Sequence, residues 1–153
     1  MKRAFTMIEL IFVIVLLSIL AAVAIPKLAA TRDDAEISKS ASSLATLIMD
    51  ISTYYTSVGG FKSDTKWKNI TRVNLLLDNS GSAIDNTTSI NTDVFLSVKN
   101  KGCSKISVSD GIVTVSNIGT SNDTICVAFN EVESVKKLTK THKFGGSNVK
   151  FNP

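Results

Sequence analysis

An uninterrupted apolar run near the N-terminus constrains this chain more than any other feature. Residues 5–25 read FTMIELIFVIVLLSILAAVAI, and the only polar side chains among them are those of Thr6, Glu9 and Ser18. As an α-helix rising about 1.5 Å per residue, the run would be about 32 Å long, close to the hydrocarbon thickness of a bilayer. The sequence therefore predicts a membrane-spanning helix. Lys2 and Arg3 precede it, which favours a cytoplasmic N-terminus and places the rest of the chain on the other side.

Glu9 is the one ionisable residue inside this run. A carboxylate one helical turn into an apolar segment is costly unless it is paired, neutralised or able to reach the interface. Two interpretations are open. The side chain reaches the head groups from its place near the end of the span, or it pairs with a new α-amino group at Phe5, created by cleavage after Ala4, on the same or a neighbouring subunit.

The run Ala4-Phe5-Thr6-Met7-Ile8-Glu9-Leu10, followed by an apolar stretch to Pro26, resembles the class III signal of type IV pilins. The related pseudopilins of type II secretion and DNA-uptake systems carry the same signal. The resemblance implies cleavage between Ala4 and Phe5 by a prepilin peptidase and N-methylation of Phe5. It also implies an assembly role for Glu9 and a helix kink at Pro26. One residue departs from the family pattern, because Ala4 stands where Gly is usual.

The helical pattern continues beyond Pro26. Apolar side chains recur at alternating spacings of four and three, which predicts an amphipathic helix that packs on a globular head; they are Ile37, Ala41, Leu44, Ile48, Ile51, Tyr55 and Val58. The polar face is expected to carry Lys39, Ser40, Ser43, Thr46 and Asp50, and Gly59-Gly60 supplies a stop signal. We therefore expect four parts: a leader peptide at 1–4, a membrane and assembly half of the helix at 5–25, an amphipathic half at 26–58, and a head at 59–153.

The head shows β-patterning from residue 93 onward. Residues 93–98 and 124–129 read as strands, and 105–116 read as a hairpin with a two-residue turn at Asp110-Gly111. Residues 73–77 are compatible with a short helix or a strand. The last segment is compatible with a helical turn at Val132, Val135 and Leu138 or with a further strand. The expected fold class is α+β: a long N-terminal helix packed on a small antiparallel sheet, in a pilin-like layout.

The two cysteines, Cys103 and Cys126, both follow the membrane segment. In an oxidising compartment they would pair, so one disulfide is the simplest prediction, with two reduced, buried thiols as the alternative. No catalytic constellation is present, and we expect neither enzymatic activity, a cofactor nor a metal site. His142 stands among lysines, and the acids of one loop are too dispersed to predict a calcium site; they are Asp78, Asp85 and Asp93.

Two basic stretches suggest an anionic partner. Phe61 and Trp67 are interleaved with basic residues, a pattern that resembles single-stranded nucleic-acid binding, although aromatic anchors with solvated lysines are the favoured interpretation; the basic residues are Lys62, Lys66, Lys68 and Arg72. The C-terminal segment is also basic, and we interpret it chiefly as a solubilising tail; its lysines are Lys136, Lys137, Lys140, Lys143 and Lys150.

These features predict a structural subunit of a type IV pilus-like filament, serving type II protein secretion or a related pilus. Its expected location is the bacterial inner membrane, with a single span, a periplasmic head, and a filament in the periplasm or at the cell surface. Its expected partners are a prepilin peptidase, an inner-membrane assembly platform and other pilin-like subunits, alike or different. The alternatives are a DNA-uptake pilin whose basic head binds DNA, an anchored domain that never polymerises, and a secreted protein cleaved near Ala24 or Ala30.

Overall fold

The computed structural model describes residues 5–109, 111–118 and 123–145. The chain divides into two compact units, Met1–Ala35 and Glu36–Pro153, which are described separately below. Helix α1, Met7–Val58, begins in the first unit and ends in the second, and Pro26 lies inside it. The predicted long helix is confirmed with a start at Met7 rather than Phe5, and the backbone stays helical through Pro26. The helix ends where Gly59 and Gly60 take φ values of 80° and 154°, which L-residues with side chains rarely adopt.

The C-terminal half of α1 buries one face. The predicted stripe is confirmed at five positions, to which the structure adds Leu47; the five are Ile37, Ala41, Leu44, Ile48 and Ile51. Tyr55 is half-buried, and the prediction is wrong for Val58, which is exposed. The prediction is wrong for Ser40, which was expected on the polar face but is buried. Its hydroxyl donates to the carbonyl oxygen of Ser97 over 3.2 Å. A polar side chain can lie at this helix–sheet contact because the strand supplies its acceptor.

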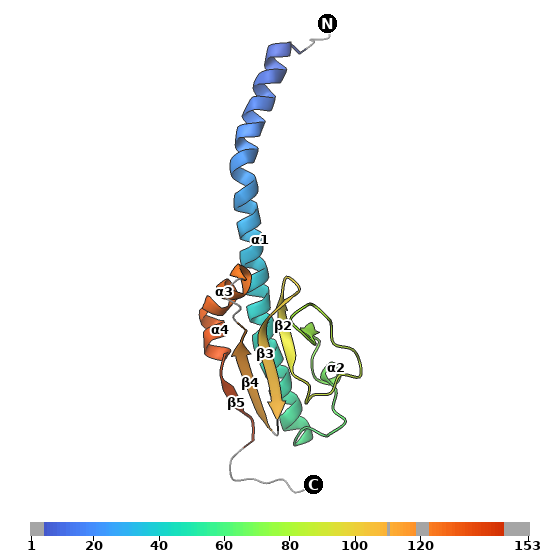
Figure 1. The fold of residues 1–153 in the computed structure, drawn as a ribbon. Coiled ribbons are helices and arrows are strands. Elements are labelled where there is room, and N and C mark those ends of the chain that lie inside the picture. Colours follow the sequence, from blue (N-terminus) through green and yellow to red (C-terminus); the bar gives the residue numbers. More distant parts are fainter. Residues whose placement is uncertain (1–4, 110, 119–122, 146–153) are drawn as a thin grey trace. The chain divides into compact units, whose positions relative to one another are not determined.

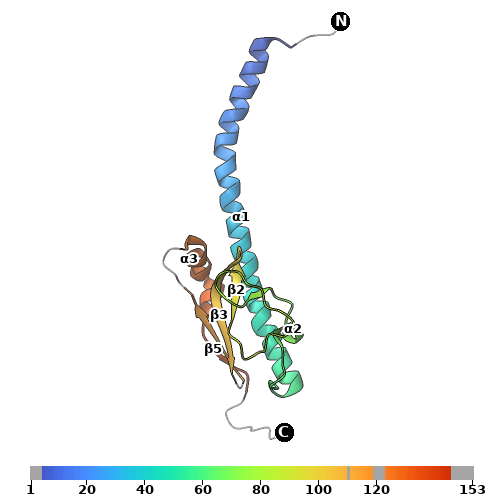
Figure 2. The same ribbon diagram turned by 45° about the vertical axis from the view of Figure 1, so that its right-hand side comes forward.

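The sheet has five antiparallel strands whose spatial order equals their order in the chain. The strands are β1 (Leu75–Leu76), β2 (Val94–Val98), β3 (Lys101–Ser109), β4 (Ile112–Asn117) and β5 (Thr141–Lys143). In Figure 1 and Figure 2 the strands of the head run alongside the C-terminal half of α1. Side chains from α1 and from one sheet face form a single core, which also includes Trp67, Phe129 and Val135. The α+β, pilin-like layout is confirmed.

Two tight turns connect the central strands. Ser109 pairs with Ile112 and Gly111 has φ of 75°, so the predicted two-residue turn joins β3 to β4, with Asp110 outside the described residues. Between β2 and β3, Lys99 and Asn100 have φ of 50° and 64°. Two successive positive φ values are the signature of a type I′ hairpin turn.

The structure corrects the prediction of a strand at 124–129. These residues form helix α3, Thr124–Glu131, followed by α4, Glu133–Leu138. The run TICVAF is rich in strand-forming types, but Asp123 precedes it and its carboxylate accepts a hydrogen bond from the Ile125 N–H, which caps a helix. Cys126 and Phe129, three residues apart, then point into the core. The helical turn proposed near Val135 is confirmed, and β5 follows it.

The connection between α1 and β2 is more ordered than a surface loop. It contains the short helix α2, Trp67–Ile70, and strand β1 at residues 75–76. Trp67 is fully buried, and its indole N–H donates to the Thr92 carbonyl over 3.0 Å. Ile84 and Ile90 are also buried, although their segment has a loop-like composition. The interpretation of Trp67 as an anchor is therefore confirmed.

Candidate assembly site in the N-terminal helix

The first turn of α1 is closed by a reciprocal pair, Thr6 and Glu9. One carboxylate oxygen of Glu9, Oε2, accepts from the Thr6 backbone N–H over 2.9 Å and from the Thr6 hydroxyl over 2.8 Å. In return the Glu9 N–H donates to Thr6 Oγ1 over 3.3 Å. This is a capping box, which satisfies donors that a helix N-terminus leaves open. The Thr-x-x-Glu spacing is visible in the sequence, but it lies within the apolar run and was not recognised there.

The capping box changes what Glu9 offers to a partner. Both hydrogen bonds use Oε2, so Oε1 makes no hydrogen bond to the residues that the structure describes. Glu9 is thus fixed by its own chain while one oxygen stays available for a cation. Phe5, where the resemblance places the cleaved terminus, lies just before this turn and is 83% exposed.

The helix surface beyond Glu9 is apolar on all sides. None of the described residues before Ile37 is buried, and large apolar side chains are exposed from Phe5 to Leu28. Ser18 donates its hydroxyl to the Ile14 carbonyl over 2.7 Å. With Thr6 and Glu9 bonded to each other, every polar side chain of residues 5–25 has a partner in its own helix. The segment can therefore enter lipid, or contact apolar helices, with each polar side chain hydrogen-bonded and only Glu9 Oε1 without a partner among the described residues.

Helix α1 is the one helix of the described residues that is long and apolar enough to cross a membrane. A helix that is apolar all round needs a nonaqueous environment on every side. Joined to the α+β head, it gives the layout of a pilin-like protein. The family model for the prokaryotic N-terminal methylation motif matches residues 1–25. The chain thus carries the class III prepilin signal of type IV pilin-like proteins. Comparison with curated proteins and with solved structures gave no significant match.

The cleavage, the methylation and the helix kink that the resemblance implies all stay predictions. Ala4 lies outside the described residues, so the cleavage at Ala4–Phe5 stays a prediction, as does methylation of Phe5. Pro26 lies within α1 without ending it, and a kink there also stays a prediction. The structure adds Thr6 to the predicted set, because it holds the Glu9 carboxylate directly.

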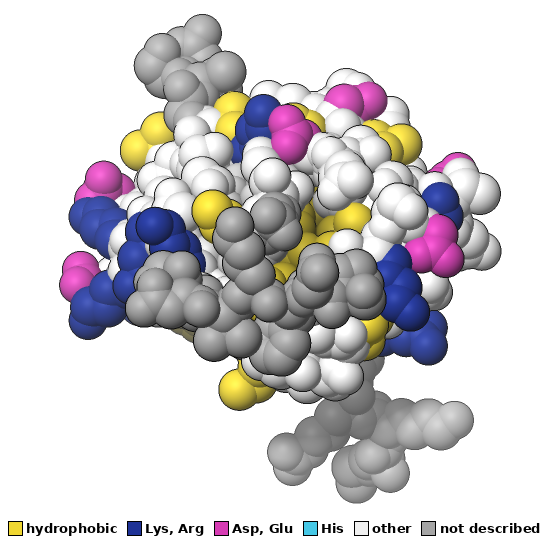
Figure 3. All heavy atoms as spheres, turned by 90° about the horizontal axis from the view of Figure 1, so that it is seen from below, with side chains coloured by type: hydrophobic (Ala, Val, Ile, Leu, Met, Phe, Trp, Pro, Cys, Tyr) yellow, Lys and Arg dark blue, Asp and Glu magenta, His cyan; other side chains and the backbone are white. Residues whose placement is uncertain are grey.

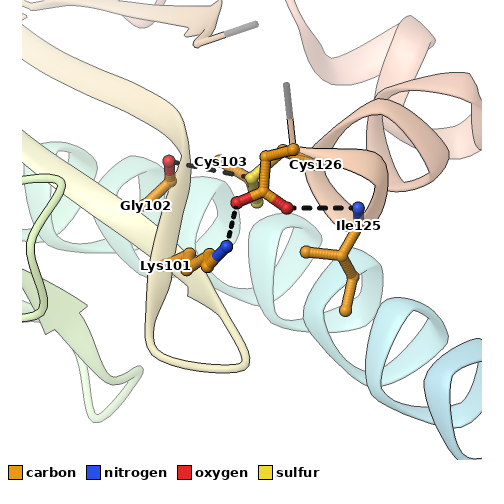
Figure 4. A network of polar contacts seen from close by, with 6 residues as sticks. Lys101, Gly102, Cys103, Ile125 and Cys126 are labelled. Atoms are coloured by element: carbon orange, nitrogen blue, oxygen red, sulfur yellow. Dashed lines mark hydrogen bonds and ion pairs between the residues drawn. A yellow bond between two sulfur atoms is a disulfide. The ribbon is translucent and has the colours of Figure 1, made fainter. Parts of the chain in front are cut away.

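The two cysteines form the Cys103–Cys126 disulfide, which links β3 to α3 with 5.0 Å between their Cα atoms. Both residues are buried. Figure 4 shows the polar contacts around the bond: Lys101 Nζ lies 2.6 Å from Asp123 Oδ2, and Asp123 Oδ1 accepts from the Ile125 N–H. The hydrogen bond from Lys101 holds the pKa of Asp123 below its ordinary value. The bond and the ion pair together fix the start of α3 against the sheet.

The other charged candidates are held by local contacts. Hydrogen bonds from the Thr88 and Thr87 hydroxyls lower the pKa of Asp85 to about 2. Asp78 accepts from Ser80, and Asp93 pairs with Lys105 at 2.7 Å. His142 lies on β5, where Nε2 is 2.8 Å from the Leu138 carbonyl oxygen. Among the described residues no three His, Cys, Asp or Glu side chains are grouped in a way that could hold a metal ion.

The C-terminal lysines are partly neutralised. Lys136 lies 2.6 Å from a Glu131 carboxylate oxygen, and Lys137 lies 3.5 Å from one of Glu133. Lys140 and Lys143 are exposed, and Lys150 lies outside the described residues. This segment therefore projects less positive charge than its lysine content alone indicates.

Proposed function

We propose that the chain is a structural subunit of a filament assembled from the bacterial inner membrane, in type II protein secretion or a related pilus. The observation that carries the proposal is the exposed apolar half of α1 together with its methylation motif. Residues 5–25 would first lie in the bilayer and then exchange lipid contacts for contacts with other subunits. The two environments have similar polarity, so packing and polar pairing decide where each subunit adds.

Glu9 would provide that pairing. Prepilin peptidase would cut before Phe5, and the methylated α-amino group of an adjacent subunit would meet the Glu9 oxygen that the capping box leaves open. A charge pair in a nonaqueous environment is costly to break and sensitive to geometry. It would therefore set the register of the incoming subunit. With Lys2 and Arg3 on the cytoplasmic side, the head would lie in the periplasm, beside an assembly platform in the inner membrane.

Two substitutions of Glu9 separate its charge from its capping role. Glu9→Gln removes the charge but keeps an oxygen for the Thr6 donors, since Gln also serves in a capping box. Glu9→Ala removes both. We expect both variants to reach the membrane fraction in normal amounts and to be absent from sheared filaments, as measured by immunoblotting in the native host. Normal filament yield from Glu9→Gln would contradict the charge-pairing mechanism.

The processing step is tested by mass spectrometry of the N-terminus. We expect a mature chain that begins with N-methylated Phe5 in the wild type. Ala4→Gly restores the usual family residue and serves as the matched control, with processing at least as complete. A mature chain that begins at Met1, or beyond residue 22, would contradict the proposal, and the second result would support conventional secretion.

DNA capture by the C-terminal lysines, the second candidate function, gains no specific support from the structure. Two of the five lysines of this segment, Lys136 and Lys137, already face carboxylates. Exposed ion pairs of this kind are weak, so they lower the local field rather than abolish it. The Glu9 experiment also tests the alternative of an anchored domain that never polymerises. In that case the wild-type chain would be absent from sheared filaments, as both Glu9 variants would be.

A further inference from the structure

The net charge of the head is concentrated in one segment. Residues 36–153 carry thirteen Lys and Arg and ten Asp and Glu, which gives a net charge of +3. Residues 61–72, FKSDTKWKNITR, carry four basic residues and one acidic residue and thus the same net charge, +3. The other residues of the head therefore have a net charge of zero. We call residues 61–72 the basic segment.

The basic side chains of this segment are not neutralised. Lys62, Lys66, Lys68 and Arg72 form no ion pair with any residue that the structure describes. By contrast, Lys101, Lys105, Lys136 and Lys137 each lie within 4 Å of a carboxylate. Figure 3 shows Lys and Arg side chains at the left, the right and the top centre of this end of the head, with Asp or Glu side chains near them. The basic segment itself contains one acidic residue, Asp64.

The backbone of the basic segment is held so that its basic side chains point outward. Thr65, Trp67 and Thr71 are buried, and they alternate with Lys66, Lys68 and Arg72, of which the last two are exposed. Trp67 bonds to Thr92 through its indole N–H, and the Thr71 hydroxyl donates to Asp50 Oδ2 over 2.6 Å. The Asp50 carboxylate is thereby committed to the interior side of the segment. The backbone that carries the basic side chains is held in place before any ligand binds, which lowers the entropy cost of binding.

Aromatic rings continue the surface at the start of the segment. Phe61 is half-buried and stacks on Tyr54 with 6.3 Å between ring centroids and 6° between ring planes. Tyr55 contacts the same ring at 5.2 Å in a tilted geometry. A run of basic side chains that begins at half-buried aromatic rings resembles the pattern of single-stranded nucleic-acid recognition, in which phosphates contact cations and bases stack on rings.

We propose that the basic segment is a binding site for single-stranded nucleic acid. Phosphates would contact Lys62, Lys66, Lys68 and Arg72, and bases would stack on Tyr54 and Phe61. An anionic bilayer fits less well, because no large apolar side chain of the segment is exposed to enter the acyl region. A duplex also fits less well, since α2, with four residues, is too short to fill a major groove. This site lies within the head and does not depend on filament assembly.

The test uses the full chain in neutral detergent and a fluorescently labelled oligodeoxythymidine of about 12 nucleotides. We expect a rise in fluorescence anisotropy on binding, with log affinity falling against log salt at a slope of about −3, as four single-strand phosphate contacts require. K62Q/K66Q/K68Q/R72Q should abolish binding. K136Q/K137Q/K140Q/K143Q removes the same number of charges from α4 and β5 and should retain it. Circular dichroism would confirm that both variants are folded.

Single substitutions keep the test informative if the quadruple variant does not fold. K68Q and R72Q should each reduce the salt slope by about 0.7. Phe61→Leu keeps the apolar volume but loses the ring, and should lower affinity for oligodeoxythymidine by about tenfold without changing affinity for an abasic oligomer. Three results would overturn the proposal: no binding, equal loss in the two quadruple variants, or preference for phosphatidylglycerol vesicles over the oligonucleotide.

Discussion

At the scale of single residues, the molecule depends on how isolated polar groups are satisfied. Glu9 is tolerable in an apolar helix because Thr6 supplies two donors, and Ser18 is tolerable because it bonds to the carbonyl of Ile14. Neither arrangement needs a second chain. In the proposed filament, a subunit would therefore cross lipid alone and still present the Glu9 Oε1 atom to a neighbour.

Thr6→Val should show whether the capping hydroxyl matters. The substitution keeps the Thr6 N–H bond to Glu9 but removes the hydroxyl that both donates and accepts, so the first turn should lose about 1 kcal/mol. We expect unchanged membrane insertion and a several-fold lower filament yield, measured by immunoblotting of sheared filaments against the membrane fraction. Thr6→Ser keeps the hydroxyl and should behave as the wild type. Equal yields from the Val and Ser variants would show that the hydroxyl has no part in assembly.

Asp123 gives a pH-dependent prediction. Its pKa is lowered in the folded chain, chiefly by the hydrogen bond from Lys101, so the ionised form stabilises the fold. That stability is present above the unfolded-state pKa of about 3.9 and is lost as pH falls through the folded-state pKa. Asp123→Asn keeps a good N-cap but removes the charge. We expect a lower Tm than the wild type at pH 7 and a gap that closes below about pH 4, measured by circular dichroism. A gap of constant size across this range would exclude the ion pair as its cause.

At the scale of elements, local backbone geometry limits the stability of the β2–β3 hairpin. Asn100 has φ of 64°, which Gly adopts without steric cost. Asn100→Gly should therefore raise the free energy of unfolding, by up to about 1 kcal/mol, measured by urea denaturation of the detergent-solubilised chain. Asn74→Gly is the matched control, because Asn74 is exposed and is not among the described residues with positive φ. A gain at position 74 equal to that at 100 would rule out the turn geometry as the reason.

The elements also show what the sequence could and could not predict. The burial of α1 follows from its periodicity, because a helix against a sheet must present one apolar face. The β3–β4 hairpin follows from Asp110-Gly111. The prediction of a strand at 124–129 is wrong because it rests on the β-branched and aromatic residues of this run. Asp123, just before the run, is a helix N-cap residue, and this local signal predicts the helix that the structure shows. The burial of Trp67 depends on a partner 25 positions away, Thr92, and no local pattern predicts such a contact.

At the scale of the whole molecule, the two units differ in whether their apolar side chains are buried. The buried core contains residues from Ile37 to Val135 and none from the first unit. The first unit instead exposes its apolar side chains, which only lipid or other subunits can cover. The proposed anchoring and assembly roles fall on the first unit, whereas the buried core and the Cys103–Cys126 bond lie in residues 36–153.

A chain that begins at residue 36 tests this division. Since the truncation removes no core residue, we expect a folded head with the disulfide formed and a Tm within about 5 °C of that of the full chain, a shift that corresponds to about 1 kcal/mol for a domain of this size. It should remain monomeric without detergent in size-exclusion chromatography and should be unable to join filaments. A chain that begins at residue 45 is the matched variant. It loses Ile37, Ala41 and Leu44 from the core and should unfold, because deleting buried apolar side chains costs several kcal/mol. If the chain from residue 36 were unfolded, the apolar half of α1 would be needed for the head itself, and assembly and folding could not be separate properties of the two units.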